Sequence, residues 1–331
     1  MTDFALTDSP TTDSPTTGFL VIGESVADIV RTPGRPEVTH PGGSPANVAY
    51  GLARLGQPTA LLTQLGADPA GRLIARHLRS AGVRLHTDDG QRTPTAIVTL
   101  DQHGSARYAF DIHWTLRDTR LAATPRHVHF GSIAAVREPG AAATLAMVAR
   151  LRERATVSYD PNVRVQLMGE RAAAVTQVER CVALSDLAKA SDEDLAWLYP
   201  GEPEQSVAAR WLALGPAAVL VTRGSQGSVG FTRGGATTAP APATTVADTV
   251  GAGDSFMSAT LDALAALGLL GGPARPALAA LTADALAGVL HRAAAAAAIT
   301  VSRPGANPPT AQELRDHPAL PDPADVAAPT G

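Results

Sequence analysis

The stretch Ala247–Phe256 reads ADTVGAGDSF, and a long alanine- and leucine-rich segment follows it. Glycine-rich backbone just before a helix lets consecutive N–H groups point at one spot, where the helix dipole adds positive potential. Such a spot suits an anion with developing charge, for example a phosphoryl group in transfer, and Asp254 at the helix mouth is placed to accept a proton. The alternative is that Asp254 caps the helix while the glycines form a turn.

Two common nucleotide-binding motifs are excluded by the sequence. The motif GxGxxG needs a glycine three residues after Gly253, where the chain has Phe256, and the stretch lies far from the first expected strand. A P-loop of the form GxxxxGK[ST] would have to end at Lys189, the only lysine among 27 basic residues, and nothing glycine-rich precedes it. A bound nucleotide would therefore be held by backbone amides and arginines rather than by a P-loop lysine.

A second glycine-containing segment, PGGSPANVAYGLARLG, occupies residues 41–56. Ser44 is expected to be the N-cap of a helix and Pro45 its first residue. The pair Gly42 and Gly43 allows a ligand to approach the backbone closely. Asn47 lies in the first helical turn, where its amide would bind the hydroxyls of a polyol or would simply face water.

Strand and helix signals alternate along the rest of the chain. Buried strands are expected at residues 18–24, 59–66, 127–132, 155–162 and 217–224, and helices at 45–55, 70–83, 141–154, 172–184, 255–267 and 284–301. Two alternating arms, 95–100 and 105–112, predict a hairpin. This order predicts a mostly parallel sheet covered by helices on both faces, with ligands at the carboxyl ends of the strands.

Composition restricts the class of protein. Of 331 residues 45% are hydrophobic but only 4% are aromatic, so the core must consist mainly of Ala, Val and Leu. A net charge of -4 argues against a general binder of nucleic acid or anionic membranes. Cys181 is the only cysteine, which excludes an internal disulfide and fits a cytoplasmic protein. No uninterrupted apolar run reaches the ~20 residues that span a bilayer.

Both ends of the chain are expected to be loose. Residues 1–17 contain the near-repeat TDSPTTDSPTT, lack Lys and Arg, and predict a disordered tail rather than a secretory signal. Residues 318–331 are rich in Pro, Ala and Asp and predict a second loose tail.

The two glycine-containing segments together resemble the signature regions of the PfkB carbohydrate kinases, the ribokinase-like family. The segments HFGSIA, YDPNVR, KASDEDL and VSRPGANPPT are similar to the fructokinase-like branch. The resemblance implies a three-layer α/β/α sandwich with a mostly parallel central sheet and a small β-sheet lid. It also implies one kinase domain at residues 18–317, with lid segments near 24–42 and 93–113.

The resemblance assigns the chemistry to the first stretch. Asp254 matches the general base that takes the proton of a sugar hydroxyl as this hydroxyl attacks the γ-phosphorus of ATP. Gly251, Ala252 and Gly253 match the anion hole, and small residues permit amides to be aimed at the developing charge.

Sugar contacts are implied from several parts of the chain. Asp28, Gly42, Gly43 and Asn47 match positions that bind the sugar, although Asp28 taken alone is equally compatible with a turn. Arg107 and Phe110 of the hairpin are candidates for contacts from the lid, with a solvated arginine and a lid-core phenylalanine as alternatives. Arg164 is placed to bind a phosphate or a sugar acid, and a surface salt bridge is its alternative.

Nucleotide and ion contacts follow from the same resemblance. The nucleotide side is assigned to Lys189, Thr222, Gly224 and Gly227. Magnesium would arrive with ATP, and Asp194 stands where the family has an acidic residue linked to this ion. Asp248 and the Val250 carbonyl match the site of a monovalent cation such as potassium. Pro309 stands where ribokinases have a serine ligand, which weakens the expectation of potassium activation.

His127 and His129 share one strand face, as two metal ligands would. No third ligand is near in sequence, so an ordinary strand is the preferred interpretation.

The resulting prediction is an ATP- and magnesium-dependent kinase of fructose or another ketose or sugar acid. Ribokinase, 2-keto-3-deoxygluconate kinase and nucleoside kinase are alternatives within the family. A non-catalytic sugar or nucleotide sensor and a dinucleotide-binding oxidoreductase are alternatives from other classes. The expected partners are the sugar and ATP, with no nucleic acid and no membrane, and a homodimer through the lid is a hypothesis.

Overall fold

The computed structural model describes residues 18–89, 92–100, 106–119, 121 and 123–320. The predicted N-terminal tail lies outside the described residues. So do residues 321–331 of the predicted C-terminal tail and residues 101–105 of the predicted hairpin.

A nine-stranded sheet with the order β13-β12-β11-β10-β9-β8-β1-β4-β5 forms the centre of the molecule. The strands from β11 to β5 pair in parallel, whereas β12 and β13 are antiparallel additions at one edge. The bounds are β1 (Phe19–Ile22), β4 (Thr59–Leu65), β5 (Arg84–Asp89), β8 (His127–Gly131), β9 (Thr156–Asp160), β10 (Leu187–Ser191), β11 (Ala218–Thr222), β12 (Ser228–Thr232) and β13 (Gly235–Ala239).

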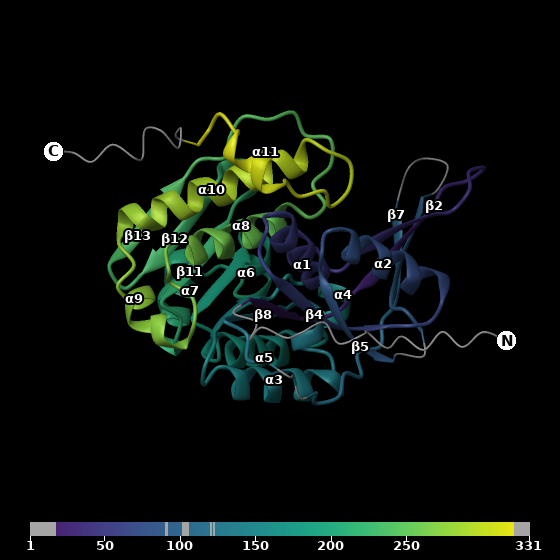
Figure 1. Cartoon of the computed structure of the whole chain (residues 1–331), viewed down its shortest axis with the longest axis horizontal. Coiled ribbons are helices and arrows are strands. Elements are labelled where there is room, and N and C mark those ends of the chain that lie inside the picture. Colours follow the sequence, from purple (N-terminus) through teal and green to yellow (C-terminus); the bar gives the residue numbers. More distant parts are fainter. Residues whose placement is uncertain (1–17, 90–91, 101–105, 120, 122, 321–331) are drawn as a thin grey trace.

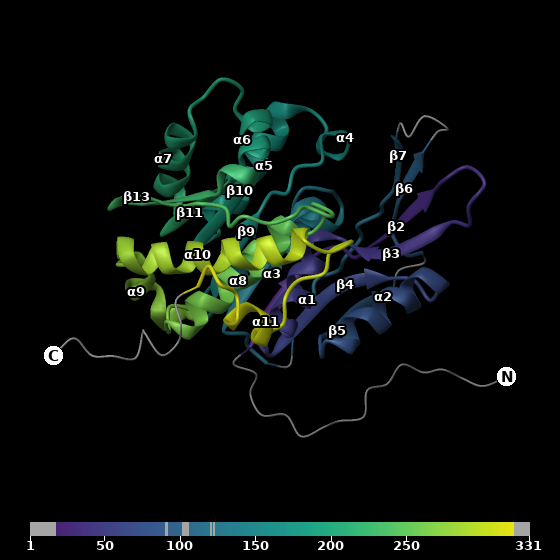
Figure 2. The ribbon, with the colours of Figure 1, turned by 90° about the horizontal axis from the view of Figure 1, so that it is seen from above.

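Helices cover both faces of this sheet (Figures 1 and 2). One hydrophobic core lies under α1 (Ser44–Arg54), α2 (Pro69–Ser80), α8 (Ala252–Ala266), α9 (Arg275–Ala279), α10 (Ala283–Val301) and α11 (Ala311–Arg315). The other lies under α3 (Gly140–Leu151), α5 (Arg171–Ala183), α6 (Asp192–Leu198) and α7 (Glu204–Leu214). Short segments complete the chain: α4 (Val165–Met168), η1 (Ser132–Ala135), η2 (Gly224–Gln226) and η3 (Gly272–Ala274). The predicted α/β/α sandwich is confirmed.

A second, four-stranded sheet projects from one side of the body (Figure 2), and we call it the lid sheet. Its order is β3 (Val38–Gly42), β2 (Val26–Arg31), β6 (Thr95–Leu100) and β7 (Ala106–Asp111). The register places His40, Asp28, Ala96 and Phe110 in one row across the four strands. Because cross-strand neighbours point to the same face of a sheet, these four side chains share a face.

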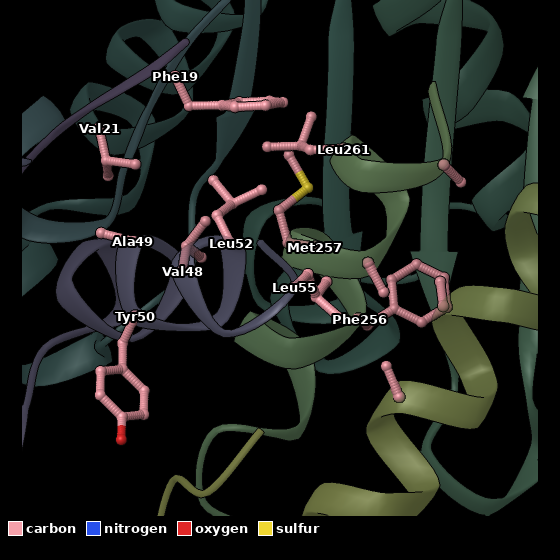
Figure 3. Packing of buried hydrophobic residues seen from close by; sticks show 14 of the residues in the cluster. Phe19, Val21, Val48, Ala49, Tyr50, Leu52, Leu55, Phe256, Met257 and Leu261 are labelled. Carbon is pink, nitrogen blue, oxygen red and sulfur yellow. The ribbon is translucent and has the colours of Figure 1, made fainter. Parts of the chain in front are cut away.

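Two helices that are distant in sequence, α1 and α8, pack side by side (Figure 3). Val48 and Leu52 of α1 meet Met257 and Leu261 of α8 beneath β1, all four side chains being fully buried. Gly51 allows this close approach, because a Cβ there would lie 2.5 Å from the Ser258 Oγ. The packing brings the N-terminal ends of both helices to the carboxyl ends of the central strands.

The N-terminal ends of these helices differ from the sequence-based expectation. Gly43, not Ser44, is the N-cap of α1, and Ser44 is its first residue. Helix α8 begins at Ala252 rather than Ser255, with Gly251 as its N-cap. The interpretation of Asp254 as an N-cap was therefore wrong, because this residue lies inside the first turn.

Helix α10 is long and apolar enough, by composition alone, to cross a membrane. It packs instead against α8, β12 and β13, and residues such as Leu290, Ala293 and Ala295 are fully buried. We interpret α10 as a core helix of this fold.

Candidate active site

The Asp254 carboxylate is held by two side chains of α1. Ser44 Oγ donates to Asp254 Oδ1 at 2.6 Å, and Asn47 Nδ2 donates to Asp254 Oδ2 at 2.9 Å. Each carboxylate oxygen keeps further lone pairs, so Asp254 retains the capacity to accept a proton. The structure thus brings together the two glycine-containing segments of the sequence, and it fixes the orientation of the carboxylate.

The N-terminus of α8 offers backbone donors beside Asp254. Gly251 has φ 77°, a left-handed conformation that favours glycine, and a Cβ there would lie 2.6 Å from that of Ala306. Ala252 N–H donates to the Thr249 carbonyl at 3.3 Å. Gly253 N–H lies in the first turn, where N–H groups have no intrahelical acceptor. An anion at this point would meet oriented amides and the positive end of the helix dipole.

Lys189 lies next to this helix end and forms a buried ion pair. Its Nζ is 2.8 Å from Asp160 Oδ2, and both side chains are at most 5% exposed. A Cβ on Gly253 would lie 2.9 Å from the same Nζ. Burial raises the pKa of Asp160 to about 6, although Lys189 opposes this shift. Burial disfavours the charge on Lys189, but Asp160, Asp194 and Asp254 outweigh it and raise its pKa, so the ammonium is charged at neutral pH.

Asp28 on β2 lies at the lid side of the same region. Burial raises the pKa of Asp28 to about 6, while the charges of Arg164 and His40 lower it and that of Asp254 raises it. A side chain on Gly42 would occupy the space that the Asp28 carboxylate fills. These contacts place Asp28 and Gly42 together, as the sugar-binding prediction requires.

The other predicted sugar contacts are less enclosed. Arg164 is the exposed N-cap of α4, and its guanidinium donates to the Val163 carbonyl at 3.1 Å. Arg107 lies on β7 opposite Thr99, and its side chain is outside the described part of the structure. Phe110 packs at the junction of lid and body with Val26, Ile112 and Ile133.

Asp194 serves a structural contact in this structure. Its Oδ2 accepts from Ser191 N–H at 2.8 Å, as part of a capping box at the start of α6, and its Oδ1 accepts from Val163 N–H at 2.8 Å. In the described part of the chain, no group of three or more His, Cys, Asp and Glu residues is placed to hold a metal. With so few carboxylates at this point, a magnesium ion would be held mainly by phosphates and water, with Asp194 or Asp160 as acidic neighbours.

Asp248 joins the loop before α8 to the segment after α10. Its Oδ1 accepts from Val250 N–H at 3.0 Å, and its Oδ2 accepts from Gly305 N–H at 2.8 Å. Carboxylate and carbonyl oxygens suit hard cations, so Asp248 and the Val250 carbonyl fit the predicted site of a monovalent cation.

The remaining nucleotide-side residues lie at the end of β11. Thr222 is its last residue and pairs with Ser191 of β10, two residues after Lys189. Gly224 begins η2 and Gly227 follows it, with φ values of 52° and 87°, which non-glycine residues rarely adopt. Because β10 and β11 are parallel neighbours in the sheet, this turn lies on the same side of the site as Lys189.

The rings of His127 and His129 form hydrogen bonds with hydroxyl groups of β9. His127 contacts Thr156 Oγ1 and Ser158 Oγ through its two ring nitrogens, each at 2.8 Å, and His129 Nδ1 contacts the same Ser158 at 2.9 Å. Burial lowers the pKa of His129 to about 3, helped by the charge of Lys189. Both rings are therefore neutral parts of the β8–β9 core.

Three residues of the region were not assigned a role from the sequence. Ser44 was interpreted only as a cap, although its place within GGSPAN was a signal. Asp160 is the last residue of β9, and its pairing with Lys189 needs the parallel β9–β10 register, which the sequence does not show. Glu24 follows β1 and is 1% exposed. The sequence shows a carboxylate at the end of a strand, but it does not show that this carboxylate is buried.

Comparison with known proteins places this site in a family. The model of the pfkB family of carbohydrate kinases matches residues 18–313. A fructokinase of Klebsiella pneumoniae is 34% identical over 260 residues, which are 75% of this chain and 85% of that protein.

Two solved fructokinases have the same fold. The structure of Xylella fastidiosa fructokinase with bound ATP superposes with a TM-score of 0.81 at 25% identity, covering 90% of this chain and 97% of that one. A double mutant of Vibrio cholerae fructokinase, bound to fructose, ADP and a potassium ion, gives a TM-score of 0.73 at 25% identity, covering 89% and 95%. The chain belongs to the pfkB family of carbohydrate kinases and is a fructokinase-like sugar kinase.

Proposed function

We propose that this kinase transfers the γ-phosphoryl group of ATP to a hydroxyl of fructose or a related ketose or sugar acid, with Asp254 as the general base. The observation that carries the proposal is the pair of hydrogen bonds from Ser44 and Asn47 to Asp254. They fix a carboxylate at the mouth of α8, where oriented amides can receive a phosphoryl group. The preference for fructose rests on the fructokinase relatives.

In the proposed step the sugar oxygen attacks the γ-phosphorus while its proton passes to Asp254. The new O–P bond forms as the bond between the γ-phosphorus and the bridging oxygen of ADP breaks, so ADP leaves with the electron pair. Positioning and charge stabilisation supply most of the rate in such transfers. Asp254 therefore needs a fixed orientation more than a raised basicity.

The negative charge on the transferring phosphoryl group would lie next to the Lys189 ammonium and the positive N-terminal end of α8. Lys189 Nζ lies beside Gly253, and Asp160 holds it there. We assign Lys189 to the phosphoryl group rather than to the nucleoside, with the amides of Gly251, Ala252 and Gly253 as the anion hole. The Ala252 N–H would exchange its long bond to the Thr249 carbonyl, at 3.3 Å, for one to the phosphoryl group. Thr222, Gly224 and Gly227 remain the proposed contacts with the nucleotide itself.

Sugar hydroxyls would be bound between the lid sheet and α1. Asp28 projects from the lid sheet, Gly42 and Gly43 admit the sugar to the backbone, and Asn47 lies next to Asp254. Arg107 and Arg164 remain proposed contacts, and Arg164 would favour a substrate with a carboxylate or phosphate.

Two ions would assist. Magnesium neutralises the phosphates when it is bound with ATP, and Asp194 would orient its water shell. A monovalent cation held by Asp248 and the Val250 carbonyl would add positive charge beside the anion hole.

Two such chains would pair through the exposed strands of the lid sheet as a homodimer, which the elution volume in gel filtration would reveal.

The deciding experiment measures ADP release with a panel of ketoses, sugar acids and nucleosides. We expect fructose to be turned over and Asp254→Asn to lower kcat by about 10²–10⁴-fold. Asp284→Asn, on the exposed first turn of α10, is the matched control that should leave kcat unchanged. Equal turnover by wild type and Asp254→Asn would exclude Asp254 as the base, and the panel itself identifies the sugar.

A further inference from the structure

Glu24 is a buried carboxylate that the proposed reaction does not use. It follows β1 and is 1% exposed, and its Oε2 accepts from Ala134 N–H at 3.0 Å. Burial raises the pKa of Glu24 to about 7, although donation from the Ser132 hydroxyl and from the backbone of Ala134 and Ile133 opposes this shift. Hydrogen bonds from several donors offset part of the cost of burying such a carboxylate.

These donors belong to a tight turn, residues 131–135, that follows the neighbouring strand β8. Ser132 has φ 54°, a left-handed conformation that costs a non-glycine residue of the order of 1 kcal/mol or more. Its Oγ also accepts from Asn162 Nδ2 at 3.3 Å, and Asn162 after β9 has φ 38°. Ser132 and Asn162 are the only non-glycine residues with positive φ in the part of the chain that the structure covers. Both strained turns therefore meet next to Glu24.

The turn carries one of the contacts between body and lid sheet, next to those that α2 makes with β2 and β3. Ile133 is 5% exposed and packs against Val26 at the start of β2 and Ile112 just after β7, the two strands that leave and re-enter the body. Leu167 of α4 packs against the same cluster. Ile133 therefore anchors the lid sheet at the ends of β2 and β7, while α2 contacts β2 and β3.

The backbone of Glu24 lies against the segment that leads into α1. A Cβ on Gly43 would lie 2.6 Å from the Glu24 carbonyl oxygen, and Gly43 precedes Ser44, the donor to Asp254. One residue thus touches both the turn that anchors the lid sheet and the segment that orients the proposed base.

From these contacts we infer that Glu24 is a positioning residue: its carboxylate holds the 131–135 turn so that Ile133 fixes the lid sheet over the sugar site. The inference deepens the proposed function and rests on it for its kinetic consequences. Loss of the carboxylate would loosen the lid without removing any group that touches sugar or ATP.

The first arm of the test is kinetic. At about pH 8, above the raised pKa of Glu24, the isosteric Glu24→Gln variant should raise KM for the sugar by about tenfold and change kcat at saturating sugar by less than about twofold. Ile133→Ala should have the same effect, and the double variant should be no worse than either single one, because both act through one turn. An unchanged KM, or effects that multiply in the double variant, would overturn the inference.

The second arm needs no turnover. Trypsin can cleave the lid sheet after Arg31, which is exposed at the β2–β3 end, whereas the bond after Arg35 leads into Pro36 and resists trypsin. Glu24→Gln should be cut there several times faster than wild type while its Tm is not lowered, as mass spectrometry and thermal unfolding would show. Equal cleavage, or a lowered Tm with losses in both KM and kcat, would reduce Glu24 to a structural role. If wild type turns over no sugar but cleavage still differs, the proposed function fails and the anchoring role stands.

Discussion

Ser44 Oγ lies 2.6 Å from Asp254 Oδ1, although 210 residues separate the two along the chain. The contact exists because α1 and α8 pack in register, with Gly51 against Ser258. Hydrogen bonds to a carboxylate orient it strongly, so we expect Ser44→Ala to lower kcat by about tenfold, with little change in the KM for ATP. Steady-state kinetics with both substrates varied would measure this, and a variant as active as wild type would show that Asn47 alone suffices.

Gly253 should tolerate no side chain. An added Cβ would lie 2.9 Å from Lys189 Nζ, so Gly253→Ala should displace the ammonium and lower kcat by tenfold or more, roughly the effect of a misplaced catalytic group. Gly288→Ala in α10 is the control, because a Cβ there meets nothing within 4 Å. Alanine is the better helix former, so this control should keep full activity and raise the unfolding free energy by up to about 1 kcal/mol. Thermal unfolding and kcat for both variants would check the pair.

Removing one partner of the buried ion pair should destabilise the fold. Lys189→Met leaves the Asp160 carboxylate buried without its partner, so the fold must bear either the unpaired charge or the cost of protonating it, which is about 3–5 kcal/mol in comparable cases. Adding Asp160→Asn removes that charge and should restore much of the unfolding free energy but not the activity. Denaturant titration and kcat of the single and double variants distinguish the two roles. Recovery of activity in the double variant would contradict an assignment of Lys189 to the phosphoryl group.

Glu24 should make stability depend on pH in a defined direction. Its pKa is raised from 4.5 to about 7 in the folded chain, so between these values the folded state binds the additional proton. The Glu24 contribution to the unfolding free energy is therefore full below about pH 4.5, and about 3 kcal/mol is lost as the pH rises through 7.

The measurement is the difference between Glu24→Gln and wild type across this range. The buried His127 and His129 have lowered pKa values and act with the opposite sign, but they are present in both proteins and cancel in the difference. The variant should gain stability relative to wild type as pH rises from about 4.5 to about 8. A difference that stays constant would mean that Glu24 titrates normally.

Periodicity and turn residues predicted most of the central sheet and its helices, because long apolar runs and alternating segments determine them locally. Several elements were missed, among them β5, β13, α6 and α7, and three of the missed strands have a physical reason. Strand β3 contains Pro41, which is tolerated only because this strand is at an edge. Strand β12 contains Gly230, whose lack of a side chain makes room for Leu286 of α10. Strand β10 has the sequence LAKAS, and its polar Lys189 finds its partner only across the sheet.

The candidate site was predictable as far as the motifs reached. The glycine-containing segments placed Asp254 and Asn47 in one region, but the direct bonds of Ser44 and Asn47 to Asp254 depend on the approach of two helices. The same limit applies to Glu24, since its donors come from a turn more than 100 residues away. A single sequence carries no record of such pairings.

The confinement of Lys189 has a practical consequence. Lys189 bears the only side-chain amine of the protein, because all the other residues among its 27 Lys and Arg are arginines. Its low exposure and its bond to Asp160 shield that amine from reagents such as active esters. Amine acylation at residue 189 is therefore a single-position footprint of this site: its rate, followed by mass spectrometry of the peptide that contains Lys189, would report any opening around the helix end without a competing lysine signal and separately from the α-amine of the chain.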